Sequence, residues 1–126
     1  MRVAIVGTRD YANLAEVASY VMNLPPDVTV VSGGARGVDQ AAIEAATMRG
    51  LATQVILPDW NKYGKSAGII RNGLLFDQCA AVVAFWDGTS RGTYNMIQRC
   101  REAKKPLTIF LQDGGKVELH HAEGAL

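Results

Sequence analysis

The turn between residues 32 and 39 has the residue types of an anion-binding site. Its sequence, Ser-Gly-Gly-Ala-Arg-Gly-Val-Asp, joins a β-branched run to an alanine-rich helical segment. Glycine lets the backbone approach a ligand, and the N–H groups at the start of a helix favour phosphate. The pattern is neither a dinucleotide fingerprint nor a Walker loop. The alternative is a tight structural turn in which Asp39 caps the helix. The candidate ligand-binding residues are Ser32, Gly33, Gly34, Arg36, Gly37 and Asp39.

Two further turns repeat this combination of glycine, hydroxyl groups and cation. One runs from Trp86 to Thr93 and the other from Gly7 to Asp10, each directly after an apolar run. The glycine-hydroxyl turns at 32–39 and 86–93 together predict a site that holds phosphate from both sides, through backbone N–H groups and helix N-termini. Arg9 could contact phosphate or stack on a base, and the alternative is that it is an ordinary surface residue. The candidates in these turns are Gly7, Thr8, Arg9, Gly88, Ser90, Gly92 and Thr93.

The segment from Pro58 to Asn72 mixes aromatic and basic residues with glycine. Aromatic rings can stack on a nucleobase, and cations can pair with phosphate. Arg71 stands near the start of a predicted helix, where the dipole disfavours a cation. An arginine at this position is easier to explain if it contacts an anionic ligand. For Trp60 and Tyr63, the alternative is that their rings cover the rim of the core. The candidates are Trp60, Tyr63, Lys65, Arg71 and Asn72.

Alternating strand and helix patterns place all of these segments at one edge of a sheet. Short apolar strands separated by amphipathic helices indicate an α/β fold, a doubly wound Rossmann-like domain with a mostly parallel five-stranded sheet and helices on both faces. Ligands of such folds bind beyond the carboxyl ends of the strands. The predicted strands are Val3–Val6, Val28–Val31, Thr53–Leu57, Ala80–Phe85 and Leu107–Leu111, and the predicted helices are Tyr11–Leu24, Val38 to Gly50, Ser66–Asp77 and Thr93–Ala103. Residues 1–112 form this domain, and residues 113–126 add a C-terminal turn and tail, in which Val117–Leu119 can form a short last strand.

Composition limits the classes of function. The chain has 126 residues, 48% of them hydrophobic, and a formal net charge of +1, which argues against nucleic acid as a partner held by bulk charge. No apolar run is long enough for a membrane span, and the first residues indicate a strand rather than a secretory signal. Cys79 and Cys100 are too few for a disulfide framework or a metal cage and predict reduced, buried thiols in the cytoplasm. No metal or cofactor is predicted.

The motifs together resemble the SLOG superfamily of Rossmann-like nucleotide-binding domains, from about Val3 to Leu111. Small stand-alone members of unknown role share a Ser-Gly-Gly-Ala-x-Gly-x-Asp turn, an Ala-Gly-x-x-Arg-Asn segment and a Ser-x-Gly-Thr turn. These motifs stand here at residues 32–39, 67–72 and 90–93. The combination is specific for the superfamily and not for one reaction. The family pattern and the apolar helix faces predict a homo-oligomer, with a dimer expected.

Two related families imply different activities. Cytokinin-activating phosphoribohydrolases cleave the base from a nucleoside monophosphate, and Gly92-Thr93 and Arg71 match their motif. Met96 stands where their catalytic glutamate would be, and methionine can neither stabilise an oxocarbenium-like centre nor activate water. Asp39 or Glu44 would have to replace it. The turn at 32–39 also looks like the Ser-Gly-x-Ala-Arg-Gly-Ile-Asp turn of the DNA-processing protein A family, which uses the arginine in a DNA phosphate pocket.

Binding of a nucleotide-derived small molecule is therefore the leading prediction. The ligand class is a nucleoside phosphate, ADP-ribose or a cyclic relative, and the role is that of a sensor or sequestering module. The first alternative is a nucleoside 5′-monophosphate phosphoribohydrolase, with Arg71, Asp39 and Glu44 as catalytic residues. The second alternative is single-stranded DNA binding through Arg36 and Lys65. Whether the chain is an enzyme stays open at this point.

Overall fold

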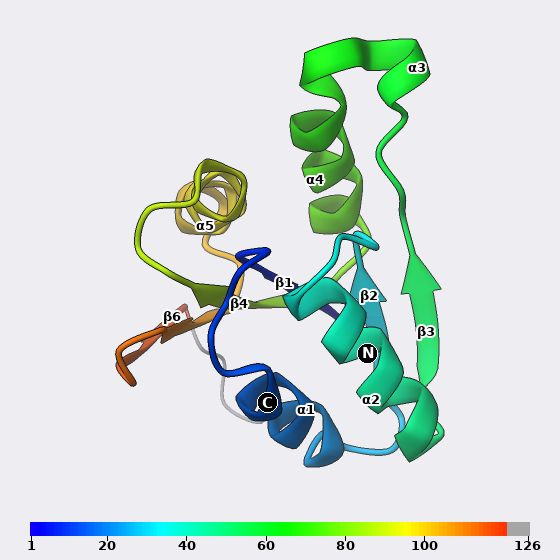
Figure 1. Cartoon of the computed structure of the whole chain (residues 1–126), viewed down its shortest axis with the longest axis vertical. Coiled ribbons are helices and arrows are strands. Elements are labelled where there is room, and N and C mark those ends of the chain that lie inside the picture. The colour runs from blue at the N-terminus through cyan, green and yellow to red at the C-terminus, as the bar shows by residue number, and fades with distance from the viewer. Residues whose placement is uncertain (121–126) are drawn as a thin grey trace.

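The computed structural model describes residues 1–120 and contains a twisted sheet with helices on both faces (Figure 1). The strand order is β3-β2-β1-β4-β5-β6, with parallel pairing throughout except at β6. The strands are β1 (Arg2–Gly7), β2 (Thr29–Ser32), β3 (Ala52–Val55), β4 (Ala81–Trp86), β5 (Leu107–Leu111) and β6 (Lys116–Leu119). The helices are α1 (Leu14–Met22), α2 (Val38–Arg49), α3 (Trp60–Tyr63), α4 (Ala67–Asp77) and α5 (Arg91–Ala103), with a 3-10 turn at Gly64–Ser66.

Each face of the sheet has its own apolar core. Alternate side chains of a strand point to opposite faces, and in β1 this sends Val3 and Ile5 to one core and Ala4 and Val6 to the other. Helices α1 and α2 cover the first core, and α4 and α5 cover the second, as Figure 1 shows. The doubly wound Rossmann-like prediction is thereby confirmed.

The sheet has six strands where five are predicted. The extra strand, β6, pairs antiparallel with β5 through a hairpin in which Gly114 has φ +99° and its N–H bonds to Leu111 O at 2.9 Å. Gly114 tolerates this left-handed conformation because it lacks a Cβ atom. The hairpin, therefore, makes residues up to 119 part of the sheet, and the part of the predicted tail from residue 121 on lies outside the described residues.

Other predicted boundaries move by a few residues. Helix α1 begins at Leu14, because Asn13 is its N-cap and accepts from the Glu16 N–H at 3.2 Å. The predicted Trp60 loop contains the short helix α3, capped by Asp59, which accepts from the Lys62 N–H at 3.1 Å. The predicted C-cap of α2 is confirmed, since Gly50 is left-handed with φ +83°.

Two expectations about the environment of the chain bear on the fold. Among residues 1–120, no helix combines the length and the apolar character that crossing a bilayer requires. Cys79 and Cys100 are free and buried, as expected, and burial raises the pKa of Cys100 to about 12. The cytoplasm as the compartment stays a prediction.

Candidate functional site

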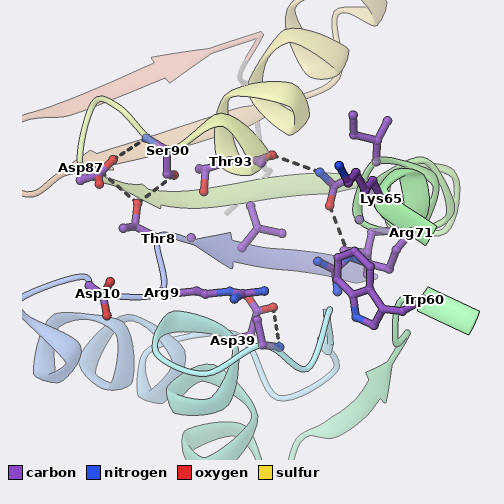
Figure 2. A pocket seen from close by; sticks show the side chains of 18 residues that line it. Thr8, Arg9, Asp10, Asp39, Trp60, Lys65, Arg71, Asp87, Ser90 and Thr93 are labelled. Carbon is purple, nitrogen blue, oxygen red and sulfur yellow. Dashed lines mark hydrogen bonds between the residues drawn. The ribbon is translucent and has the colours of Figure 1, made fainter. Parts of the chain in front are cut away.

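A pocket of about 430 Å³ opens beyond the carboxyl ends of β1, β2 and β4, with α4 as a further wall (Figure 2). Its volume lies within the range typical of small-molecule sites. It forms where segments far apart in sequence converge, which is the edge that a doubly wound sheet uses for ligands. The lining residues are Val6, Gly7, Thr8, Arg9, Asp10, Ala35, Asp39, Trp60, Lys65, Gly68, Ile69, Arg71, Asn72, Leu75, Asp87, Ser90, Gly92 and Thr93.

The β4–α5 turn presents an open helix N-terminus to the pocket. The Asp87 carboxylate accepts from the N–H groups of Thr89 and Ser90, both at 2.8 Å, and these bonds lower the pKa of Asp87. The first bond from the helix runs from Tyr94 N to Ser90 O at 3.2 Å. The N–H groups before Tyr94 therefore have no partner within α5, and those of Gly92 and Thr93 belong to residues that line the pocket. This helix end can receive an anion.

Thr8 ties the β1 end to this turn. Its buried hydroxyl accepts from the Asp87 N–H at 3.1 Å and lies 3.1 Å from the Ser90 hydroxyl (Figure 2). The Trp86 indole N–H adds a bond to Ser90 O at 3.0 Å. The turn is consequently held in place before any ligand arrives, which lowers the entropic cost of binding.

The β2–α2 turn is built differently, because a side chain of the protein already occupies it. The Asp39 carboxylate is buried and accepts from the Ala35 N–H at 3.1 Å. Burial raises the pKa of Asp39, while the Ala35 bond and the nearby Arg71 oppose the rise. An acidic side chain thus stands in the first turn of α2 and bonds to the loop before the helix, and an anion site at this turn stays a prediction.

The glycines of that turn serve packing rather than the pocket surface. A Cβ on Gly37, which has φ +81°, would lie 2.1 Å from the Arg9 carbonyl oxygen. A Cβ on Gly33 would lie 2.2 Å from Nη1 of Arg71. Ser32 is fully buried, and its hydroxyl donates to Ile5 O at 2.9 Å. The turn therefore brings β1, β2 and α4 close together.

Arg71 reaches across the pocket from α4 to β2. Its Nη1 donates to Gly33 O at 2.6 Å, so the carbonyl fixes the guanidinium in the absence of ligand. Burial lowers the pKa of Arg71, Asp39 opposes this, and the like charge of Arg9 adds to the lowering. The next residue, Asn72, is buried and donates to Gly92 O at 3.0 Å, which joins α4 to the start of α5.

The open side of the pocket carries an aromatic ring and further cations. Trp60 is 53% exposed and lies near Lys65 and Arg71 in Figure 2, while Arg9 extends from the other side of the pocket toward Asp39. An exposed indole beside charged side chains offers a flat surface for stacking. The pocket thus has a polar inner wall and an aromatic rim.

Most of the predicted site residues meet in this pocket. It includes Gly7, Thr8, Arg9, Asp39, Trp60, Lys65, Arg71, Asn72, Ser90, Gly92 and Thr93. The pocket lining does not include Ser32, Gly33, Gly34, Arg36, Gly37, Tyr63, Gly88 or Glu44.

Two charged residues outside the lining have their own partners. Arg36 is exposed and forms an ion pair with Asp10 at 3.6 Å, and exposed pairs of this kind contribute little to stability. Glu44 is exposed on α2 and accepts from Gln40 Nε2 at 3.1 Å. Asp87 and Asp10 are lining residues missing from the predicted set, and their positions directly after β4 and β1 are the sequence signal for them.

Met96, at the position of the phosphoribohydrolase glutamate, is fully buried in the core between the sheet and α4–α5. Its side chain is not part of the pocket lining. A phosphoribohydrolase mechanism would therefore need its carboxylate from elsewhere, and of the two proposed substitutes only Asp39 lies in the pocket. Within residues 1–120, no three histidine, cysteine, aspartate or glutamate side chains cluster as metal ligands.

The fold and the pocket define a Rossmann-like binding module, and comparison with known proteins specifies its family. Residues 1–63 match the model of the YspA, cpYpsA-related SLOG family. The chain is 33% identical over 119 residues to the Gene 61 protein of Mycobacterium phage D29, covering 86% of this chain and 95% of that protein. The chain belongs to the YspA, cpYpsA-related SLOG family.

Solved structures of DNA processing protein A share the fold. The Streptococcus pneumoniae protein superposes with a TM-score of 0.74 at 23% identity over 86% of this chain. The Helicobacter pylori protein, from a study of its "unique single-stranded DNA binding mode", superposes with a TM-score of 0.65 at 21% identity over the same share. The chain spans 49% and 64% of the length of these two proteins.

The likeness to these structures corrects one prediction. The near-neutral charge leads to the prediction that nucleic acid is not a partner. That prediction is wrong, because net charge does not exclude nucleic acid for this fold. The same fold is present in a protein whose structure is described by its single-stranded DNA binding mode. A net charge averages over the whole surface, whereas a strand of nucleic acid contacts one local region, so the average does not decide the matter.

Proposed function

We propose that this chain is a binding module for a nucleotide-derived ligand, with the phosphate at the start of α5. The observation that supports this most strongly is that three cationic side chains line the same pocket as an open helix N-terminus. Arg9 and Arg71 lie close enough for Arg9 to lower the pKa of Arg71, and Lys65 lines the same pocket. Like charges repel one another, so their convergence is stabilised when an anion binds between them.

The rim of the pocket suits a nucleobase. Trp60 leaves 53% of its surface exposed at the pocket mouth. Stacking of a base on an aromatic ring contributes about 1–3 kcal/mol. A ligand with a phosphate at one end and an aromatic base at the other satisfies both ends of the pocket. Nucleoside phosphates, ADP-ribose and cyclic nucleotides share this chemistry.

The test is native mass spectrometry and thermal shift with AMP, ADP-ribose and a cyclic dinucleotide. Retention of one intact nucleotide with a rise in Tm is the expected result. Arg71→Gln should weaken binding by about tenfold or more, because it removes a charge-assisted contact. Arg101→Gln, in the last turn of α5 and outside the pocket, is the matched control. Absence of any retained nucleotide would refute the proposal, and release of free base would identify a hydrolase instead.

Single-stranded DNA binding is the second candidate, favoured by the likeness in fold to DNA processing protein A. Exposed Trp60, with Lys62 and Lys65 in the same segment, offers a stacking ring beside cations. Fluorescence anisotropy with a labelled oligothymidylate distinguishes the two candidates. DNA binding predicts a steep fall in affinity with salt and a loss in Trp60→Ala, and absence of binding at low salt removes this candidate.

A further inference from the structure

The strand order arranges the pocket elements in a row that matches the parts of a nucleotide. Along the edge of the sheet, β4 leads to the open N-terminus of α5, β1 contributes Gly7 and Thr8, β2 leads to Asp39, and β3 leads to Trp60. Neighbouring strands lie about 4.8 Å apart, so the α5 end and the Asp39 region are separated by about 10 Å at the level of the backbone. A phosphate at α5 and a base at Trp60 place the sugar between them, beside Asp39.

Asp39 differs from the other carboxylates of the pocket in its burial and bonding. It is only 4% exposed, whereas Asp10 is exposed and paired with Arg36, and Asp87 is occupied by two N–H groups of its own turn. The Asp39 carboxylate accepts from Ala35 N (Figure 2) and also interacts with the Gly33 N–H and the Ser32 hydroxyl, and an ionised carboxylate has about four acceptor sites in all. A buried carboxylate in a binding pocket repels phosphate and attracts hydrogen-bond donors.

We infer that Asp39 is a specificity residue that accepts hydrogen bonds from the ribose hydroxyls of the ligand, and so selects ribonucleotides over deoxyribonucleotides. This inference rests on the proposed function. The chemistry has a general precedent in dinucleotide-binding folds, where a carboxylate binds a ribose hydroxyl. A ligand without the hydroxyls leaves the remaining acceptor sites of the buried carboxylate unfilled in a closed complex, and unfilled buried polar sites are a source of discrimination.

The Asp39–Arg71 pair supports this assignment. Arg71 is already bonded to Gly33 O, and its charge opposes the rise in the pKa of Asp39 that burial causes. The guanidinium has five N–H donors in all, so others are left for the ligand. One wall of the pocket thus offers an acceptor and a cationic donor side by side to the ligand.

The experiment is calorimetry with AMP, 2′-deoxy-AMP, 3′-deoxy-AMP and IMP. Wild-type protein should bind AMP and IMP about equally, and each deoxy analogue roughly tenfold to a hundredfold more weakly. Asp39→Asn, checked for folding by its thermal melt, should bind AMP more weakly and lose most of the discrimination. Asp77→Asn removes the same charge at an exposed position outside the pocket and should behave as wild type.

The outcomes separate this inference from the proposed function. Equal binding of AMP and both deoxy analogues to wild-type protein overturns the role of Asp39 and leaves nucleotide binding intact. A loss with IMP but not with the deoxy analogues shows that a base amino group is recognised instead, which also overturns it. If none of the four nucleotides binds, the proposed function fails first.

Discussion

Gly33 should be essential because it makes room for Arg71. Its φ is not in the left-handed region, so alanine meets no backbone strain there, but the new Cβ would lie 2.2 Å from Nη1 and 2.5 Å from Cζ of Arg71. The guanidinium must move away and give up its 2.6 Å bond to Gly33 O. A hydrogen bond with a charged partner contributes about 1.5–3 kcal/mol, and the half-buried guanidinium regains part of this in water.

We therefore expect Gly33→Ala to lower the free energy of unfolding by about 1–2 kcal/mol and nucleotide affinity by about as much as Arg71→Gln. Urea denaturation of a double-mutant cycle with Arg71→Ala measures the coupling without any ligand. With no guanidinium present, the glycine substitution should be nearly neutral. Gly73→Ala is the control on α4, because its Cβ meets only Arg99 at an ordinary 3.5 Å. Additive losses from Gly33→Ala and Arg71→Ala would refute the reasoning.

Three further substitutions probe the site. Asp39→Asn should be more stable than wild type at pH 7. Because folding raises the pKa of the Asp39 carboxyl, wild type loses stability as the pH rises above the ordinary carboxyl pKa of about 4, and the neutral amide does not. Urea denaturation should show that this difference in the free energy of unfolding disappears as the pH falls toward about 4. A wild type more stable than the variant at pH 7 would contradict the raised pKa. Thr8→Val leaves the Asp87 N–H without its partner and should lower stability by about 1–3 kcal/mol; an unchanged Tm would mean that this bond is unimportant. Met96→Glu buries an unpaired carboxylate and should abolish folding, with Met96→Leu as the tolerated control; a folded Met96→Glu protein would show that the side chain reaches the pocket.

Hydrophobic periodicity was sufficient to predict the sheet and most of its helices. The apolar runs of β1, β2 and β4 are buried on both faces, so they appear as short continuous strands in the sequence. The same periodicity explains the position of Met96, which shares an apolar stripe with Ile97 and Cys100. Helix α3 is too short for a periodic pattern, and the contacts that hold it come from the tertiary structure.

The sequence predicts where the candidate site lies better than it predicts what each of its side chains contacts. Motifs that follow strands converge because parallel strands end at one edge. The contact between Arg71 and Gly33 joins residues that are 38 positions apart, and no local pattern shows it. The burial of Asp39 does have a local signal, since it shares a helical face with Ala42 and Ala46 at spacings of three and four.

The predicted homo-oligomer stays a prediction that light scattering can test.

The two glycine turns look equivalent in sequence, yet their side chains give them opposite electrostatic character. Asp39 places a buried negative charge at the first turn of α2, and the turn at 32–37 packs against Arg9 and Arg71. No acidic residue stands in the first turn of α5. The Asp87 carboxylate before the helix already accepts hydrogen bonds from the N–H groups of Thr89 and Ser90. The α5 turn therefore offers an anion free N–H groups, whereas the α2 turn sets a buried carboxyl group beside the guanidinium of Arg71. Under the proposed function, a ligand with a phosphate and ribose hydroxyls would be bound in one orientation, with its phosphate at α5 and its hydroxyls at Asp39.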